Sequence, residues 1–178
     1  MRIISGKYRG RTIVPPRNLR ARPTTDFAKE NLFNVHVNLV DFEDLDVLDL
    51  FSGTGSISYE FASREARSVT SVEVNSVHHN FIRQTAKELK FENFYPVKAN
   101  AFLYLKSCTK KFDLVFSDAP YDLEGSDEVI KLVFERDLLK DDGFLIFEHS
   151  KDRNYEDHPF FWQSRGYGSV QFSFFKKV

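Results

Sequence analysis

The chain has 178 residues, a formal net charge of −1 and 42% hydrophobic residues. This length and composition favour one globular domain with a sizeable core. The sequence shows neither a secretory signal nor a membrane-spanning run, and its single cysteine, Cys108, excludes an internal disulfide, so we expect a cytoplasmic protein with no membrane partner.

Positive charge is concentrated at the N-terminus. The first 25 residues contain seven cations and no acid, so the rest of the chain carries an excess of acids. A basic segment on an acidic body is typical of nucleic-acid binding, although a solvated extension without a partner would show the same charges. Alternation with apolar residues predicts a hairpin over residues 2–14 that turns near Gly6 and Lys7. The cations predicted to contact nucleic acid are Arg2, Lys7, Arg9, Arg11, Arg20 and Arg22.

We expect residues 1–24 to form this basic arm and residues 25–178 to form the main domain. Thr24, Thr25 and Asp26 can cap a helix whose apolar stripe continues to Leu39. Strands are predicted over residues 47–51, 68–74, 94–97, 112–116 and 144–147, and helices over residues 56–63, 75–90, 101–107 and 126–139. The acidic pair Asp141 and Asp142, followed by Gly143, is predicted to break the last helix.

This alternation predicts an α/β fold with a mostly parallel, doubly wound sheet covered on both faces. The C-terminal residues depart from this alternation of strands and helices. Apolar residues alternate with other residues over residues 170–175, and a strand near residues 160–162 precedes them. We therefore expect a terminal hairpin whose last strand inserts antiparallel into the sheet.

The strand over residues 47–51 ends in a glycine turn, Ser52-Gly53-Thr54-Gly55. Glycines allow tight bending and close approach to a ligand, and the following helix would point its free N–H groups at that ligand. A phosphate-binding lysine is missing, and Ser58 replaces the third small residue of the dinucleotide fingerprint. Asp49 can instead accept from an ammonium group, and Glu73 has the spacing of a ribose-binding acid. S-adenosylmethionine carries both groups, although an ordinary strand-to-helix turn remains an alternative.

A second constellation, Asp118-Ala119-Pro120-Tyr121, follows the strand over residues 112–116. The Asp118 carboxylate and the Ala119 carbonyl, held outward by Pro120, can each accept one N–H of an exocyclic amine. Both bonds would turn the nitrogen lone pair toward a methyl donor, and Tyr121 can stack on the base. The alternative is a strand-ending turn with a capping acid and a core tyrosine.

With these motifs the chain resembles the bacterial 16S rRNA guanine-N2 methyltransferases (the RsmD-like family), which are S-adenosylmethionine-dependent enzymes of Rossmann-like class I fold. The matching segments are residues 1–11, 22–26, 31–34, 47–55, 72–73, 112–115, 118–121 and 148–149. The resemblance implies methylation of the N2 amine of a guanine, with 16S rRNA or the 30S subunit as partner. We expect a monomer.

The resemblance also implies roles for individual residues. Asp118, Ala119, Pro120 and Tyr121 would hold the guanine. The donor would contact Asp49, Phe51, Ser52, Gly53, Gly55, Glu73, Asn100 and Ala101. Two residues depart from the family pattern: Ala119 replaces a proline, and Asn100 replaces an acid that would hold the adenine amino group, a bond that its side-chain oxygen could still accept.

No metal site is predicted, because His78, His79 and His149 do not converge with acids or Cys108 at ligand spacing. We interpret His149 as a strand-end side chain rather than a catalytic base. Two other hypotheses remain open. One is an amine methyltransferase acting on adenine N6 in DNA or on a protein glutamine, and the other is a non-catalytic rRNA-binding assembly factor.

Overall fold

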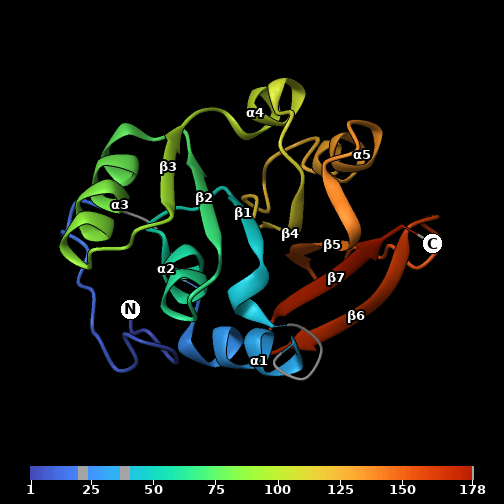
Figure 1. Cartoon of the computed structure of the whole chain (residues 1–178). Coiled ribbons are helices and arrows are strands. Elements are labelled where there is room, and N and C mark those ends of the chain that lie inside the picture. The colour runs from blue at the N-terminus through green and yellow to red at the C-terminus, as the bar shows by residue number, and fades with distance from the viewer. Residues whose placement is uncertain (20–23, 37–40, 178) are drawn as a thin grey trace.

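The computed structural model describes residues 1–19, 24–36 and 41–177. Its centre is a seven-stranded sheet with the strand order β3-β2-β1-β4-β5-β7-β6 (Figure 1). The strands are β1 (Asp46–Leu50), β2 (Ser68–Glu73), β3 (Phe94–Lys98), β4 (Phe112–Ser117), β5 (Leu139–Ser150), β6 (Phe161–Tyr167) and β7 (Val170–Lys176). Strands β1 to β5 pair in parallel, whereas β7 pairs antiparallel with both β5 and β6. The predicted fold class and the antiparallel insertion of the last strand are confirmed.

Helices cover both faces of this sheet. They are α1 (Asp26–His36), α2 (Ser56–Ser63), α3 (Ser76–Glu88), α4 (Ala101–Ser107) and α5 (Glu128–Glu135), with a short 3₁₀ helix, η1 (Phe42–Asp44), before β1. Neighbouring β1 residues belong to different cores: Val47 packs with α1, α2 and α3, and Leu48 packs with α4 and α5. Burial on both faces is what a parallel sheet requires. Among the described residues, no helix combines the length and apolar character needed to cross a bilayer.

The segment between β4 and β5 differs from the prediction. The helix α5 ends at Glu135, and β5 begins at Leu139, so Asp141 and Asp142 lie inside a strand instead of breaking a helix. Both acids are exposed, and Asp142 adopts a positive φ of 62°. The pairing of β4 with β5 shifts register at this point. An exposed bulge of this kind accommodates turn-forming residues within a strand.

The described part of the basic arm, residues 1–19, also differs from the prediction. It contains one antiparallel bridge, between Arg2 and Thr12, and no strand. The N–H of Ile3 donates to the Arg11 carbonyl, and the N–H of Ile13 donates to the Met1 carbonyl. Ile3 and Ile13 are buried in the core beside α1 and α2. The chain therefore doubles back as expected and its two segments share backbone hydrogen bonds, but it forms one bridge instead of two strands.

Candidate active site

The sheet register brings the two predicted loops together. Leu50 of β1 pairs with Val72 of β2 and with Ser117 of β4, and Ser117 pairs with Phe147 of β5. The carboxyl ends of these four parallel strands therefore meet at one sheet edge, where ligands bind in open α/β folds. The glycine turn after β1 and the loop that begins at Asp118 lie next to each other at this edge.

The glycine turn contains residues in the left-handed backbone conformation, which glycine adopts readily. Phe51, Gly53 and Gly55 have positive φ values of 56°, 57° and 86°. Gly55 is the N-cap of α2, and its N–H donates to the Ser52 carbonyl at 2.8 Å. A Cβ on Gly55 would lie 2.6 Å from the ring of Tyr59. The turn therefore needs glycine at residue 55 for both conformation and space.

Glu73 joins this turn to the end of β2. Its side chain is buried, and its two carboxylate oxygens accept the N–H of Gly53 at 2.7 Å and the N–H of Asn75 at 2.8 Å. These bonds fix the carboxylate against the glycine turn. Each carboxylate oxygen keeps further acceptor capacity, which is what a pair of ribose hydroxyls would use.

Asp49 lies under the same turn and is 1% exposed. The Ser58 hydroxyl donates to Asp49 Oδ2, which gives a role to the serine that breaks the dinucleotide fingerprint. Burial raises the pKa of Asp49 to about 7, and the negative charge of Asp118 adds to the shift. A buried carboxyl group with this pKa would be stabilised in its charged form by a cationic ligand.

The loop after β4 carries the second constellation. Burial raises the pKa of Asp118 to about 7. Ala119 is buried, Pro120 is exposed, and the Tyr121 side chain is 46% exposed. The Tyr121 hydroxyl donates to Oε1 of Glu148 at 3.2 Å. The Tyr121 ring therefore stands at the protein surface with its hydroxyl anchored to β5.

Glu148 is a site residue to which the sequence assigned no role. It is 6% exposed, and its pKa is raised to about 8 by burial and by the neighbouring Asp118 charge. It lines a shallow, open depression together with Ala119, Pro120, Tyr121 and Arg153. The sequence does contain a signal for this role: Glu148 follows the strand predicted over residues 144–147, and Asp118 follows the strand predicted over residues 112–116 of the same sheet.

His149 next to it is satisfied within the fold. Its Nε2 lies 2.8 Å from the Ser173 hydroxyl, and its Nδ1 lies 2.7 Å from the Ser150 carbonyl. Burial lowers its pKa, so it is neutral at physiological pH. These contacts agree with its interpretation as a strand-end side chain. Across the described residues, no group of three or more potential ligands has an arrangement that could hold a metal ion.

Asn100 is the N-cap of α4. Its Oδ1 accepts the N–H groups of Phe102 at 3.0 Å and Leu103 at 3.2 Å, and the next residue, Ala101, is buried. Both acceptor positions of this oxygen are therefore occupied. The amide NH₂ is the group that remains for a ligand, so Asn100 would donate to an adenine ring nitrogen rather than accept from its amino group.

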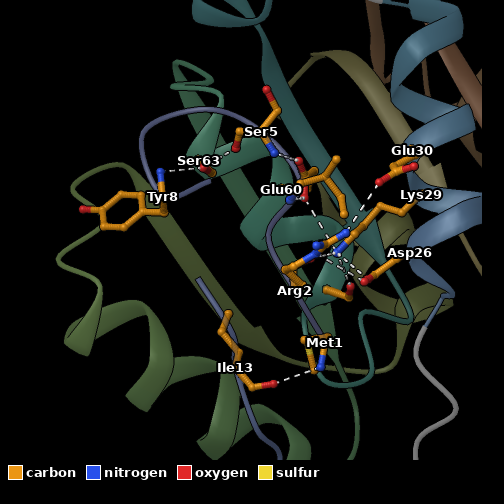
Figure 2. A network of polar contacts seen from close by, with 12 residues as sticks. Met1, Arg2, Ser5, Tyr8, Ile13, Asp26, Lys29, Glu30, Glu60 and Ser63 are labelled. Carbon is orange, nitrogen blue, oxygen red and sulfur yellow. Dashed lines mark hydrogen bonds and ion pairs between the residues drawn. The ribbon is translucent and has the colours of Figure 1, made fainter. Parts of the chain in front are cut away.

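Ion pairs fix the beginning of the basic arm. Arg2 lies 3.6 Å from Asp26 and 3.7 Å from Glu30, and its carbonyl accepts from Lys29 Nζ (Figure 2). The buried Glu60 of α2 accepts the N–H groups of Ile4 and Ser5, each at 3.0 Å. The charge of Arg2 is thus balanced by acids of the protein, whereas a cation that binds phosphate would be expected to lack such partners.

The tip of the basic arm lies near the far end of α2. The N–H of Lys7 donates to the Ser63 carbonyl, and the N–H of Tyr8 donates to the Ser63 hydroxyl. Because α2 starts at the glycine turn and runs back across the sheet, Ser63 lies about 12 Å along the helix axis from its start. Lys7, Arg9 and Arg11 are exposed, and Arg20 and Arg22 lie outside the described residues.

Comparison with known proteins gives consistent matches. Residues 1–176 match the family described as conserved hypothetical protein 95 (Cons_hypoth95). A Haemophilus influenzae protein named ribosomal RNA small subunit methyltransferase D is 31% identical over 157 residues, which covers 86% of this chain and 80% of that protein. The solved Escherichia coli protein yhhF has a TM-score of 0.84 at 28% identity, covering 98% of this chain and 96% of its own. A T. thermophilus 16S rRNA N2 G1207 methyltransferase, solved with AdoMet and guanosine, shares the fold, with a TM-score of 0.70 at 17% identity over 89% of this chain and 45% of its own.

Proposed function

The chain belongs to the conserved hypothetical protein 95 family, the RsmD family, and we propose that it transfers a methyl group from S-adenosylmethionine to the exocyclic N2 amine of a guanine in 16S rRNA. Relatives at about 30% identity are named ribosomal RNA small subunit methyltransferase D, which supports rRNA methylation. The observation that carries the proposal is the register of β1 with β4, which sets the glycine turn beside the Asp118 loop.

On the donor side, the residues suit S-adenosylmethionine. The buried Asp49 carboxyl would accept from the ammonium group, and Glu73, fixed by two N–H groups, would accept from the ribose hydroxyls. Phe51, Ser52, Gly53 and Gly55 would shape the backbone under the donor. When bound, the donor supplies an electrophilic methyl group on a sulfonium centre.

On the acceptor side, the protein orients a weak nucleophile. Asp118 and the Ala119 carbonyl would each accept one N–H of the guanine amine, so that its lone pair points at the methyl carbon. The new bond is N–C, the broken bond is S–C with its electron pair left on sulfur, and the amine proton passes to Asp118 or to water. A carboxyl group with a pKa of about 7 suits that proton transfer. Tyr121 would stack on the base after it leaves its helix.

The test measures transfer from labelled donor to bare 16S rRNA, to 30S particles and to DNA in parallel, with mass-spectrometric mapping of the product. Asp118→Asn should lower turnover about 100-fold or more and leave donor affinity near that of the wild type, because Asp118 acts on the amine. Asp122→Asn, which changes an exposed acid of the same loop, should keep wild-type turnover.

Turnover of the wild type should also rise as pH increases through about 7, because Asp118 must be ionised to accept an N–H. Full activity of Asp118→Asn would refute the role of this residue. Transfer to DNA or protein alone would favour the other amine methyltransferases, and no transfer at all would favour an assembly factor. An rRNA substrate would place the protein in the cytoplasm.

A further inference from the structure

Glu148 has one carboxylate oxygen that the fold leaves without a partner. Its side chain is 6% exposed, and Oε1 accepts from the Tyr121 hydroxyl at 3.2 Å. Oε2 is buried and has no hydrogen bond to any described residue. Buried polar atoms are almost always paired, so an unpaired carboxylate oxygen at the rim of a depression indicates a contact that a ligand completes.

The position of this oxygen relates it to the proposed reaction. Ser117, the last residue of β4, pairs with Phe147 of β5, and adjacent strands lie about 4.8 Å apart. Asp118 and Glu148 directly follow this pair. Glu148 lines the depression together with Ala119, Pro120 and Tyr121. The side chain therefore borders the groups that would hold the guanine amine.

The edge of a guanine next to its N2 amine carries the N1–H donor. Adenine has the reverse pattern, because its N1 is an acceptor. We infer that Glu148 Oε2 accepts the N1–H of the target guanine, and that Glu148 is the residue that selects guanine over bases with an unprotonated N1. This inference rests on the proposed function and adds base selection to it.

Tyr121 completes the arrangement. By donating to Oε1 it occupies one carboxylate oxygen and leaves the other for the base. Burial raises the pKa of Glu148 to about 8, so the group is neutral in the empty site near pH 7, and an arriving N–H donor favours its charged form. A base that presents a lone pair at N1 would instead accept from the neutral form, so the preference for guanine is measured above pH 8, where Glu148 is charged.

The experiment replaces the mapped guanine of 16S rRNA by 2-aminopurine through ligation, in bare rRNA and in reconstituted 30S particles. 2-Aminopurine keeps the amine at position 2 and has a lone pair at N1. Single-turnover methyl transfer is measured for the wild type, Glu148→Gln, Glu148→Ala and the exposed-loop control Glu156→Gln.

The wild type and Glu156→Gln should prefer guanine by about 10- to 100-fold, the range of one hydrogen bond to a charged group. Both Glu148 variants should reduce this preference to within about threefold, mainly because transfer to guanine slows. Donor affinity and thermal unfolding are measured for each variant to verify that it is folded. If Glu148→Ala unfolds, the near-isosteric Glu148→Gln still provides the test.

Wild-type preference retained in folded Glu148→Gln would overturn the inference and leave the proposed function in place. Absence of wild-type transfer to guanine in both rRNA forms would instead overturn the proposed function and this inference with it.

Discussion

Asp49 is a buried acid whose charge the empty protein does not balance. Its native pKa of about 7 lies above the value of about 4 expected in an unfolded chain. The native state therefore holds an extra proton between these two values, and this group lowers stability as pH rises through that window. Above about pH 7 the unfavourable contribution is complete, unless a cationic ligand balances the charge.

The substitution Asp49→Asn should consequently have opposite effects on stability and on binding. In thermal unfolding without ligand, the variant should gain more stability over the wild type at pH 8 than at pH 5. In calorimetry, its affinity for S-adenosylmethionine should fall about 10- to 100-fold, because a charge-assisted hydrogen bond to the ammonium group is lost. The exposed Asp157→Asn is the control for both measurements. Unchanged donor affinity would show that Asp49 does not bind the ammonium group.

Two glycines with similar backbones provide a matched test of the glycine turn. Gly55 has a φ of 86° and Gly10 has a φ of 80°, but a Cβ on Gly55 would lie 2.6 Å from Tyr59, whereas Gly10 has nothing within 4 Å. Both alanine variants meet the left-handed backbone strain, about 1–2 kcal/mol. Gly55→Ala should lose more stability in urea unfolding and should weaken donor binding. Equal losses would mean that Tyr59 moves aside freely.

At the scale of elements, α1, α2 and the basic arm are joined through Glu60. This side chain is fully buried, lies 3.6 Å from Lys29 and accepts two backbone N–H groups of the basic arm (Figure 2). It also lies 3.2 Å from Arg64. Removing one partner of a buried ion pair leaves the other charge uncompensated, which typically costs about 3–5 kcal/mol. Glu60 is therefore expected to contribute strongly to the attachment of the basic arm, beside the contacts of Ser63 and Lys29.

Glu60→Gln should lower the free energy of unfolding by about 3 kcal/mol in urea, because its NH₂ group would face an N–H donor or a cation. The released basic arm should then be cleaved by trypsin at Lys7, Arg9 or Arg11 faster than in the wild type. Glu88→Gln, which changes an exposed acid of α3, should do neither. Wild-type protection of these sites in Glu60→Gln would show that the apolar contacts of Ile3 and Ile13 suffice.

For the whole molecule, the placement of the basic arm constrains RNA binding. Its tip contacts Ser63, whereas the glycine turn lies at the opposite end of α2, about 12 Å away. An RNA that reaches Asp118 and the exposed arm cations would have to extend along the α1–α2 side of the protein. Arg2 is engaged with Asp26 and Glu30, so the exposed Arg9 is the better candidate for phosphate contact.

RNA affinity as a function of salt separates these two arginines. Arg9→Gln should reduce the slope of log affinity against log salt by about 1, as expected for one lost phosphate contact. Arg2→Gln should lower thermal stability through its lost ion pairs and leave the slope near that of the wild type. The opposite result would assign the phosphate contact to Arg2 and would require its ion pairs to open on binding.

Much of the fold and part of the site were accessible from the sequence, because they depend on local patterns. Strand and helix periodicity located β1 to β4 and α2 to α4, and parallel topology then placed Asp118 beside the glycine turn. The early start of β5 escaped prediction because Asp141, Asp142 and Gly143 have turn propensities that pairing with β4 overrides.

The polar contacts that depend on tertiary structure could not be predicted. Lys29 and Glu60 are of residue types that usually lie at the surface of helices, but the structure buries both, with each in contact with the basic arm. From the sequence, the side-chain oxygen of Asn100 could be assigned to a ligand. In the structure it accepts two N–H groups at the start of α4. Glu148 gained a role only when the register set it next to Asp118.

The position of β7 between β5 and β6 has a consequence for biosynthesis. Until residues 170–176 leave the ribosome, the outer edge of β5 has no neighbour, and its backbone N–H and C=O groups are free to pair with another nascent chain. A premature stop between Ser150 and Val170 would make that exposure permanent and would remove Phe172, Phe174 and Phe175 from the two cores. Such shortened products should be aggregation-prone substrates for chaperones and proteases even though every residue assigned to chemistry is present in them.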